Sequence, residues 1–304
     1  MNRREFLKSS AIASLFAADL DAMPAPRKGE GRAYLWENLT ADDFLDAVRD
    51  SKGVVLVPFG CLETHGHHLP LATDSIVACD VARRAAEKER AVVFPFSPFG
   101  MVNEVRHMGG TMALSAETMR RVFDEMCEEF ARNGLDKIII VNDHGGNNDF
   151  IGEFLRSRLE KRRPYQVYSW FVCRFTPEQT KAWNARFDGN PPSYGHACVI
   201  ESSQMMALRP ETVHMDRVRG DADGKSRHRY DPFGALHLQS PISWYADFPT
   251  QMCGETRGSS PELGEWLLDS FSDTLAKCVR LVKESNLMSE LTEEYQRGAS
   301  HPSA

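Results

Sequence analysis

Two short segments of the chain carry residues of the kinds that bind metal ions. The first runs from Gly60 to Asp74 and reads GCLETHGHHLPLATD. Alternate side chains of an extended segment point to the same side, so Glu63 and His65 can converge on one ion. Asp74 falls at the start of a predicted helix, where an acidic side chain also suits the positive end of the helix dipole. The spacing predicts a metal site of mixed carboxylate and imidazole groups.

The second segment, Asn142 to Asn147, reads NDHGGN and places His144 just beyond an apolar run. Ligands of open parallel sheets collect at the carboxyl ends of the strands, so both segments would lie at one edge. A set without thiolate suits Zn²⁺, Mn²⁺ or Fe²⁺ in a catalytic site better than it suits structural zinc. Taken singly, a histidine beside glycine is more often structural, and Gly145 with Gly146 also fits an ordinary turn.

The elements that must position these residues follow an alternating pattern. Apolar runs predict strands over residues 54–58, 91–96, 137–142 and 165–173, and helical patterns cover 73–89, 115–133, 148–162 and 261–285. Ser115 with Thr118 indicates a helix start, and Asn133 with Gly134 a helix stop. Alternating strands and helices predict an α/β fold, here a three-layer α/β/α sandwich with a mostly parallel sheet.

Three stretches do not follow this pattern. Residues 176–194 contain Gly189 and the pair Pro191 and Pro192 and predict a long loop, of a length often used as a functional lid. Trp183 would either cover the substrate from this lid or only anchor it. Residues 220–249 are expected to be irregular, and the polar residues after Leu287 are expected to form a loose tail.

The N-terminus has the layout of a bacterial twin-arginine export signal. Arg3 and Arg4 are followed by Phe6 and Leu7 and then by a short apolar stretch over residues 11–18. A membrane span needs about 20 apolar residues, so no stable membrane anchor is expected. The sequence thus predicts a signal over residues 1–30, a domain over 31–288, a tail over 289–304, and export to the periplasm. The alternative is an amphipathic helix of a cytosolic protein.

The composition excludes some classes of function. The 304 residues carry a net charge of -7, with scattered lysines and arginines, and phosphate binding needs clustered ones. No nucleic-acid partner is therefore expected. The seven cysteines lie far apart without a CxxC pair, which argues against a disulfide framework or a zinc ribbon.

The two metal-type segments resemble the motifs of the creatininase, or creatinine amidohydrolase, family, which carries Glu-x-His-Gly, a later Asp, and His-Gly-Gly-Asn. The resemblance covers residues 50–270 and includes residues 107–111 and 195–202. It implies two metal ions bridged by Asp74, with Glu63 and His144 on one ion and His65 on the other. It also implies a closed homo-oligomer, often a hexamer.

Two positions depart from the family pattern. Creatininase proper has a glutamate where this chain has Gly146, and Cys198 replaces a usual glycine. Members with His-Gly-Gly-Asn suggest that Glu201 supplies the missing metal ligand. Because Gly146 removes a creatininase glutamate, creatinine is one candidate substrate among several.

Charge counting fits a site with two divalent metal ions. Glu63, Asp74 and Glu201 with a bridging hydroxide give four negative charges, which two divalent ions would balance. The hydroxide would attack a carbonyl that the metals polarise, with Zn²⁺ the first expectation and Mn²⁺ or Fe²⁺ the others. His196, together with Glu201, is the candidate for catalysis, because imidazole moves protons in either direction near neutral pH. The alternative for His196 is a helix-start histidine bonded to backbone.

These observations predict a hydrolase that cleaves a non-peptide C–N bond in a cyclic amide, a formamide or another small amide. One alternative keeps the metals and takes a short peptide as substrate. Another is a periplasmic protein that binds metal without turnover.

Overall fold

A computed structural model describes residues 34–219 and 223–301, and the predicted export signal lies outside these residues. A five-stranded parallel sheet runs in the order β1-β3-β2-β4-β5. The strands are β1 (Tyr34–Leu35), β3 (Val92–Val93), β2 (Val54–Phe59), β4 (Lys137–Asn142) and β5 (Gln166–Phe171). The four predicted strands are confirmed, with the second reduced to two residues, and β1 is an addition at the edge.

The central strand, β2, is apolar because both of its faces are covered. All six of its residues are buried. Val54 and Leu56 pack into one core, whereas Val55, Val57 and Phe59 pack into the other. This alternation is the two-residue period of a strand between two layers, and it explains the continuous apolar run in the sequence.

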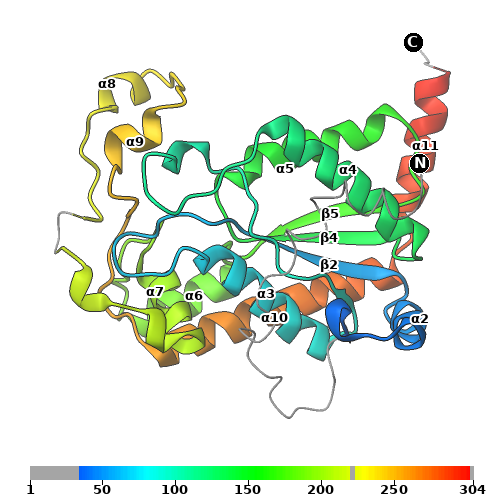
Figure 1. Cartoon of the computed structure of the whole chain (residues 1–304), viewed down its shortest axis with the longest axis horizontal. Helices are drawn as coiled ribbons and strands as arrows, with labels where there is room; N and C mark the ends of the chain where they lie inside the picture. Colours follow the sequence, from blue (N-terminus) through cyan, green and yellow to red (C-terminus); the bar gives the residue numbers. More distant parts are fainter. Residues whose placement is uncertain (1–33, 220–222, 302–304) are drawn as a thin grey trace, which may run out of the picture.

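Helices cover both faces, which confirms the three-layer α/β/α sandwich. In Figure 1, α4 (Ala116–Arg132) and α5 (Asn147–Ser157) lie on one side of the sheet, and α3 (Thr73–Lys88) and α10 (Pro261–Glu284) on the other. The remaining long helices are α2 (Ala41–Asp50), α6 (Pro177–Arg186), α7 (Val199–Leu208) and α11 (Leu287–Ser300). Within residues 34–219 and 223–301, no helix is long and apolar enough to cross a membrane.

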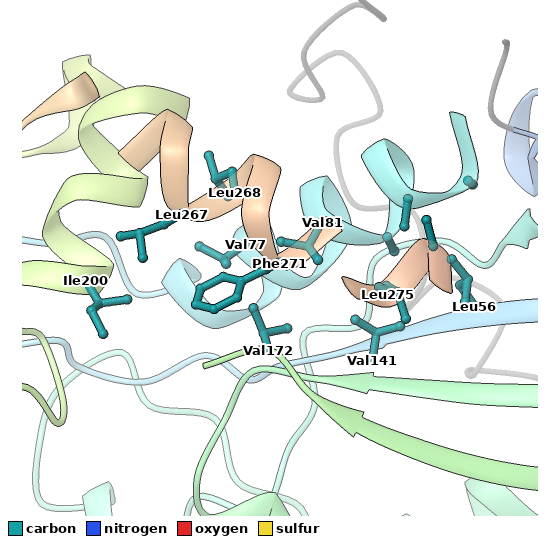
Figure 2. Packing of buried hydrophobic residues seen from close by; sticks show 14 of the residues in the cluster. Leu56, Val77, Val81, Val141, Val172, Ile200, Leu267, Leu268, Phe271 and Leu275 are labelled. Carbon is teal, nitrogen blue, oxygen red and sulfur yellow. The ribbon is translucent and has the colours of Figure 1, made fainter. Parts of the chain in front are cut away.

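The α3/α10 layer has a dense apolar core. Figure 2 shows Phe271 of α10 among Val77 of α3 and Val172 beyond β5. Phe271 is completely buried. Burying a side chain of this size stabilises the fold by about 1.5–3 kcal/mol. This packing holds the start of α3, and with it Asp74, against the end of the sheet.

The predicted helix boundaries are confirmed where capping residues mark them. The Ser115 side chain accepts a hydrogen bond from the Thr118 N–H at the start of α4, and Gly134 follows its end with a φ of 84°. The Ser260 side chain accepts from the Leu263 N–H in the same way at the start of α10. Each cap satisfies a backbone group that the helix leaves without a partner.

Two predictions of irregular structure were wrong. The expected loop over 176–194 contains α6, which starts with a capping box between Thr176 and Gln179. Trp183 lies on this helix and is only 2% exposed, so it anchors α6 in the core and does not cover the site. The expected loose tail contains α11.

The region after residue 222 carries two short helices, α8 (Asp231–Gly234) and α9 (Ser243–Asp247). Figure 1 shows these helices on the side of the molecule where strands β2 and β4 end.

Candidate metal centre and active site

The two segments with candidate metal ligands, residues 60–74 and 142–147, meet at the carboxyl ends of β2 and β4. These strands pair in parallel with Phe59 opposite Asn142, so the segments that follow them leave the sheet side by side. Glu63, His65, Asp74 and His144 are 0–5% exposed. The structure thus brings together all four residues that the motifs single out.

Asp74 lies between the two histidines. Its Oδ1 is 2.7 Å from Nε2 of His65, and its Oδ2 is 3.2 Å from Nδ1 of His144. Oε1 of Glu63 is also 2.7 Å from Nδ1 of His144. The two oxygens of one carboxylate therefore face two different sets of ligand-type atoms.

Glu201 completes the second set. It lies in the first turn of α7 and is 7% exposed, and its carboxylate accepts a hydrogen bond from the Ala197 N–H. One ligand-type atom each from His65, Asp74 and Glu201 lies within 4.8 Å of the others, and the same holds for Cys61, Glu63, Asp74 and His144. The donor sets fit two divalent cations that share Asp74.

Backbone carbonyls set the orientation of both imidazoles. Nδ1 of His65 lies 3.2 Å from the Glu63 carbonyl, and Nε2 of His144 lies 2.9 Å from the Met101 carbonyl. A carbonyl only accepts, so these nitrogens carry the protons. The opposite nitrogens are then left facing Asp74, an arrangement common for histidines that bind metals.

Two glycines permit this close approach. A Cβ on Gly60 would lie 2.4 Å from the Ser75 nitrogen, so only glycine lets the chain pass so close to the start of α3. A Cβ on Gly146 would lie 2.5 Å from Nε2 of His144 and 2.6 Å from Oε1 of Glu104. A side chain at 146 would therefore displace one of these neighbours.

The charges of the cluster depend on one another. Complete burial opposes a charge on His65, yet Asp74 raises its pKa to about 10. Burial likewise opposes a charge on Asp74, but the positive field of His65 and hydrogen bonds from both histidines hold its pKa well below the usual range. Burial raises the pKa of Glu201. The carboxylates thus draw protons onto the imidazoles, and divalent cations would compete with those protons.

A cavity of about 630 Å³ opens onto this cluster. Glu63, Asp74, His144, His196 and Glu201 form part of its wall, and Trp244 of α9 lines another part. A volume in this range is typical of small-molecule sites.

A family model described as creatininase, creatinine amidohydrolase, matches residues 37–279, which is most of the chain. The chain belongs to the creatininase family. As a member of this family it is a hydrolase that acts on carbon–nitrogen bonds.

The relatives of the chain include more than one activity. A creatinine amidohydrolase from Pseudomonas putida is 27% identical over 80% of this chain and 94% of its own length. A mycofactocin precursor peptide peptidase from Mycolicibacterium smegmatis is 35% identical over 54% of this chain and 62% of its own length. A solved creatininase described as a manganese form has a TM-score of 0.66 at 23% identity, covering 82% of this chain and 98% of its own.

His196 lies beside the cluster, as the creatininase resemblance led us to expect. Its ring centroid is 4.2 Å from that of His65, and its Nδ1 is 3.9 Å from Oε1 of Glu63. Nε2 lies 3.1 Å from the Thr64 carbonyl. The alternative interpretation is thus partly right, because His196 does bond to backbone, but its ring also lines the cavity.

Three other residues of the motif segments, His68, His107 and Cys198, do not line the cavity. His68 is buried with Nε2 3.0 Å from the Ser202 hydroxyl, and His107 is exposed with Nε2 3.1 Å from the Pro249 carbonyl. Cys198, which stands where the family usually has glycine, is buried at the start of α7. Glu201 nevertheless lies in the cluster with His65 and Asp74.

Sequence reasoning missed three carboxylates at this site. Glu104, Asp143 and Asp149 also line the cavity. Asp143 precedes His144 in the NDHGGN segment, so an acidic side chain directly beside a predicted metal ligand was the signal available. Burial, and then the negative charges of Asp74 and Glu201, raise the pKa of Asp143 well above its usual value.

Proposed function

We propose that this creatininase-family protein hydrolyses a C–N bond other than a peptide bond in a small amide, using two divalent cations. The observation that carries the proposal is the position of Asp74, whose two oxygens face separate ligand sets. In this proposal Glu63 and His144 would hold one cation, His65 and Glu201 would hold the other, and Asp74 would contribute to both.

The cations would supply Lewis-acid polarisation of the amide carbonyl and lower the pKa of a water molecule. The chain would supply proton transfer. The Thr64 carbonyl keeps the proton of His196 on Nε2, which leaves Nδ1 free to accept a proton near Glu63 and deliver it to the departing nitrogen. The Ala197 N–H donates a hydrogen bond to the Glu201 carboxylate and so fixes its position.

The nature of the cations is part of the proposal. Nitrogen and carboxylate donors suit Zn²⁺, Mn²⁺ and Fe²⁺, with Zn²⁺ the first expectation. A manganese form among the similar creatininase structures supports Mn²⁺ as an alternative.

A second candidate is hydrolysis of a short peptide. It is favoured by the 35% identity to a mycofactocin precursor peptide peptidase, which is higher than the identity to the creatinine amidohydrolase. Formation of the ring-opened product from creatinine, and release of amine or ammonia from formamides, small amides and dipeptides, by the metal-loaded chain would separate the two candidates. Asp74→Ala is the inactive reference and Glu153→Gln, an exposed change on α5, is the matched control. Metal binding without turnover of any compound by the wild type would favour a non-catalytic periplasmic protein.

We also propose export through the twin-arginine pathway and assembly into a closed homo-oligomer, such as a hexamer. The basis is Arg3 and Arg4 in the N-terminal pattern for export, and family membership for assembly. Fusion of residues 1–30 to a reporter tests export, because Arg3→Lys with Arg4→Lys should abolish it. Sedimentation of the purified protein tests the assembly.

A further inference from the structure

The wall of the cavity has a strong excess of negative charge. Among the described residues that line it, six are carboxylic acids and none is lysine or arginine. Glu63, Asp74 and Glu201 belong to the proposed metal centre, where two divalent cations would offset them. The other three, Glu104, Asp143 and Asp149, are left for whatever else enters the cavity.

Asp143 provides independent evidence for a ligand. It is 5% exposed, and its Oδ1 accepts a hydrogen bond from the Cys173 thiol at 3.4 Å. Its Oδ2 is buried without a hydrogen-bond partner among the described residues, although Asp143 lines the cavity. A buried polar atom of this kind is costly unless a partner reaches it, so the site favours a ligand that places a hydrogen-bonding group beside it.

Glu104 and Asp149 add two carboxylates that are more exposed than those of the proposed metal centre. Oε1 of Glu104 lies 3.9 Å from Nε2 of His144, but that nitrogen already donates to the Met101 carbonyl. Asp149 is exposed in the first turn of α5. Gly146 leaves the space into which Glu104 reaches, since a Cβ there would lie 2.6 Å from its Oε1.

Aromatic rings also line the cavity, from Phe171, Tyr194 and Trp244. The indole nitrogen of Trp244 donates to the Gln251 side chain at 2.7 Å, which fixes the ring beside His196. Ring faces attract cations, whereas an anionic ligand would meet carboxylates with no lysine or arginine among the described lining residues to offset them.

We propose that the substrate carries a positively charged nitrogen group, such as an ammonium or amidinium, a few atoms from the scissile amide. Glu104 and Asp149 bind this group, and Oδ2 of Asp143 forms a hydrogen bond with the same ligand. The inference rests on the proposed function, because the metal centre must hold the amide end of the same molecule.

Three hydroxamic acids of similar length test the inference, because hydroxamates anchor on metal ions: propionohydroxamic acid is neutral, β-alanine hydroxamic acid is cationic, and succinic monohydroxamic acid is anionic. Their dissociation constants for the Zn²⁺-loaded full chain are measured by titration calorimetry at pH 7 and low salt. We expect the cationic compound to bind about five- to tenfold more tightly than the neutral one. We expect the anionic compound to bind most weakly.

The double variant Glu104→Gln with Asp149→Asn should lose this preference and keep the affinity for the neutral compound. Glu153→Gln, also on α5 but outside the cavity wall, should keep the preference. Equal affinities for the three compounds, tightest binding of the anion, or a preference that persists in the double variant would overturn the inference and leave the metal centre standing. Failure of every hydroxamate to bind would overturn the inference and the proposed function together.

Discussion

Nε2 of His65 lies 2.7 Å from Oδ1 of Asp74, and both side chains are almost completely buried. The second oxygen of Asp74 faces His144, so one side chain from the first turn of α3 connects the segments that follow two strands. One carboxylate between two sets of ligand-type atoms fits the site with two cations that we propose. It leads to the predictions below.

The two proposed ions should be lost separately when ligands on one side are changed. Glu201→Gln should leave one ion per chain, because only the set with His65 and Asp74 loses a carboxylate. Glu63→Gln should also leave one ion per chain, in this case the ion held by His65, Asp74 and Glu201. Metal analysis of the dialysed variants measures this, and unchanged metal content in Glu201→Gln would show that Glu201 is not a ligand.

His196→Ala should lower kcat by about a hundredfold or more and leave the metal content unchanged, because the residue would move protons and not hold a cation. Steady-state kinetics on any amide that the wild type cleaves would measure kcat. His107→Ala, which changes an exposed histidine bonded to the Pro249 carbonyl, is the control. Loss of an ion from His196→Ala would mean that this residue is a ligand instead.

The stability of the metal-free protein should fall as the pH rises from about 7 to 10. Burial opposes a charge on His65, but Asp74 raises its pKa from 6.5 to about 10. A raised pKa stabilises the fold fully below the unfolded value of 6.5, and this contribution is lost as the pH rises through 10. His144, whose pKa is also raised, acts in the same direction.

Thermal unfolding of the EDTA-treated protein over this pH range measures the effect. His65→Gln should make the fall in Tm shallower. His228→Gln changes an exposed histidine and should not alter it. An equally steep fall in His65→Gln would contradict the assigned role of the His65–Asp74 pair.

Phe271→Ala should lower the free energy of unfolding by about 3–5 kcal/mol, because it leaves a cavity in the α3/α10 layer. Leu281→Ala changes a side chain on the same helix that is 67% exposed, and it should cost less than about 0.5 kcal/mol. Urea unfolding of both variants compares them. Similar losses would mean that the buried face of α10 is not the stabilising one.

Much of the sheet and of the site could be predicted because burial and chemistry leave strong patterns. Val54 to Phe59 is apolar throughout because both of its faces are buried, and the motifs after β2 and β4 carry unusual combinations of residue types. The short strand β1 is two residues long, so its pattern is too brief to recognise.

The errors have equally physical causes. Helix α6 buries only Gln179 and Trp183, so its sequence shows little apolar periodicity, and its start depends on the capping box. Helix α11 has no buried residue at all and therefore reads as a polar tail. The inclusion of Glu104 and Asp149 in the cavity depends on how loops approach one another, which no local pattern encodes.

The number of metal ions per chain tests the central claim most directly. Elemental analysis of the purified full chain, alongside Asp74→Ala, would count them. The bridging position of Asp74 predicts two divalent ions per chain in the wild type and the loss of both in the variant. One ion per wild-type chain, or two ions retained by Asp74→Ala, would contradict the account.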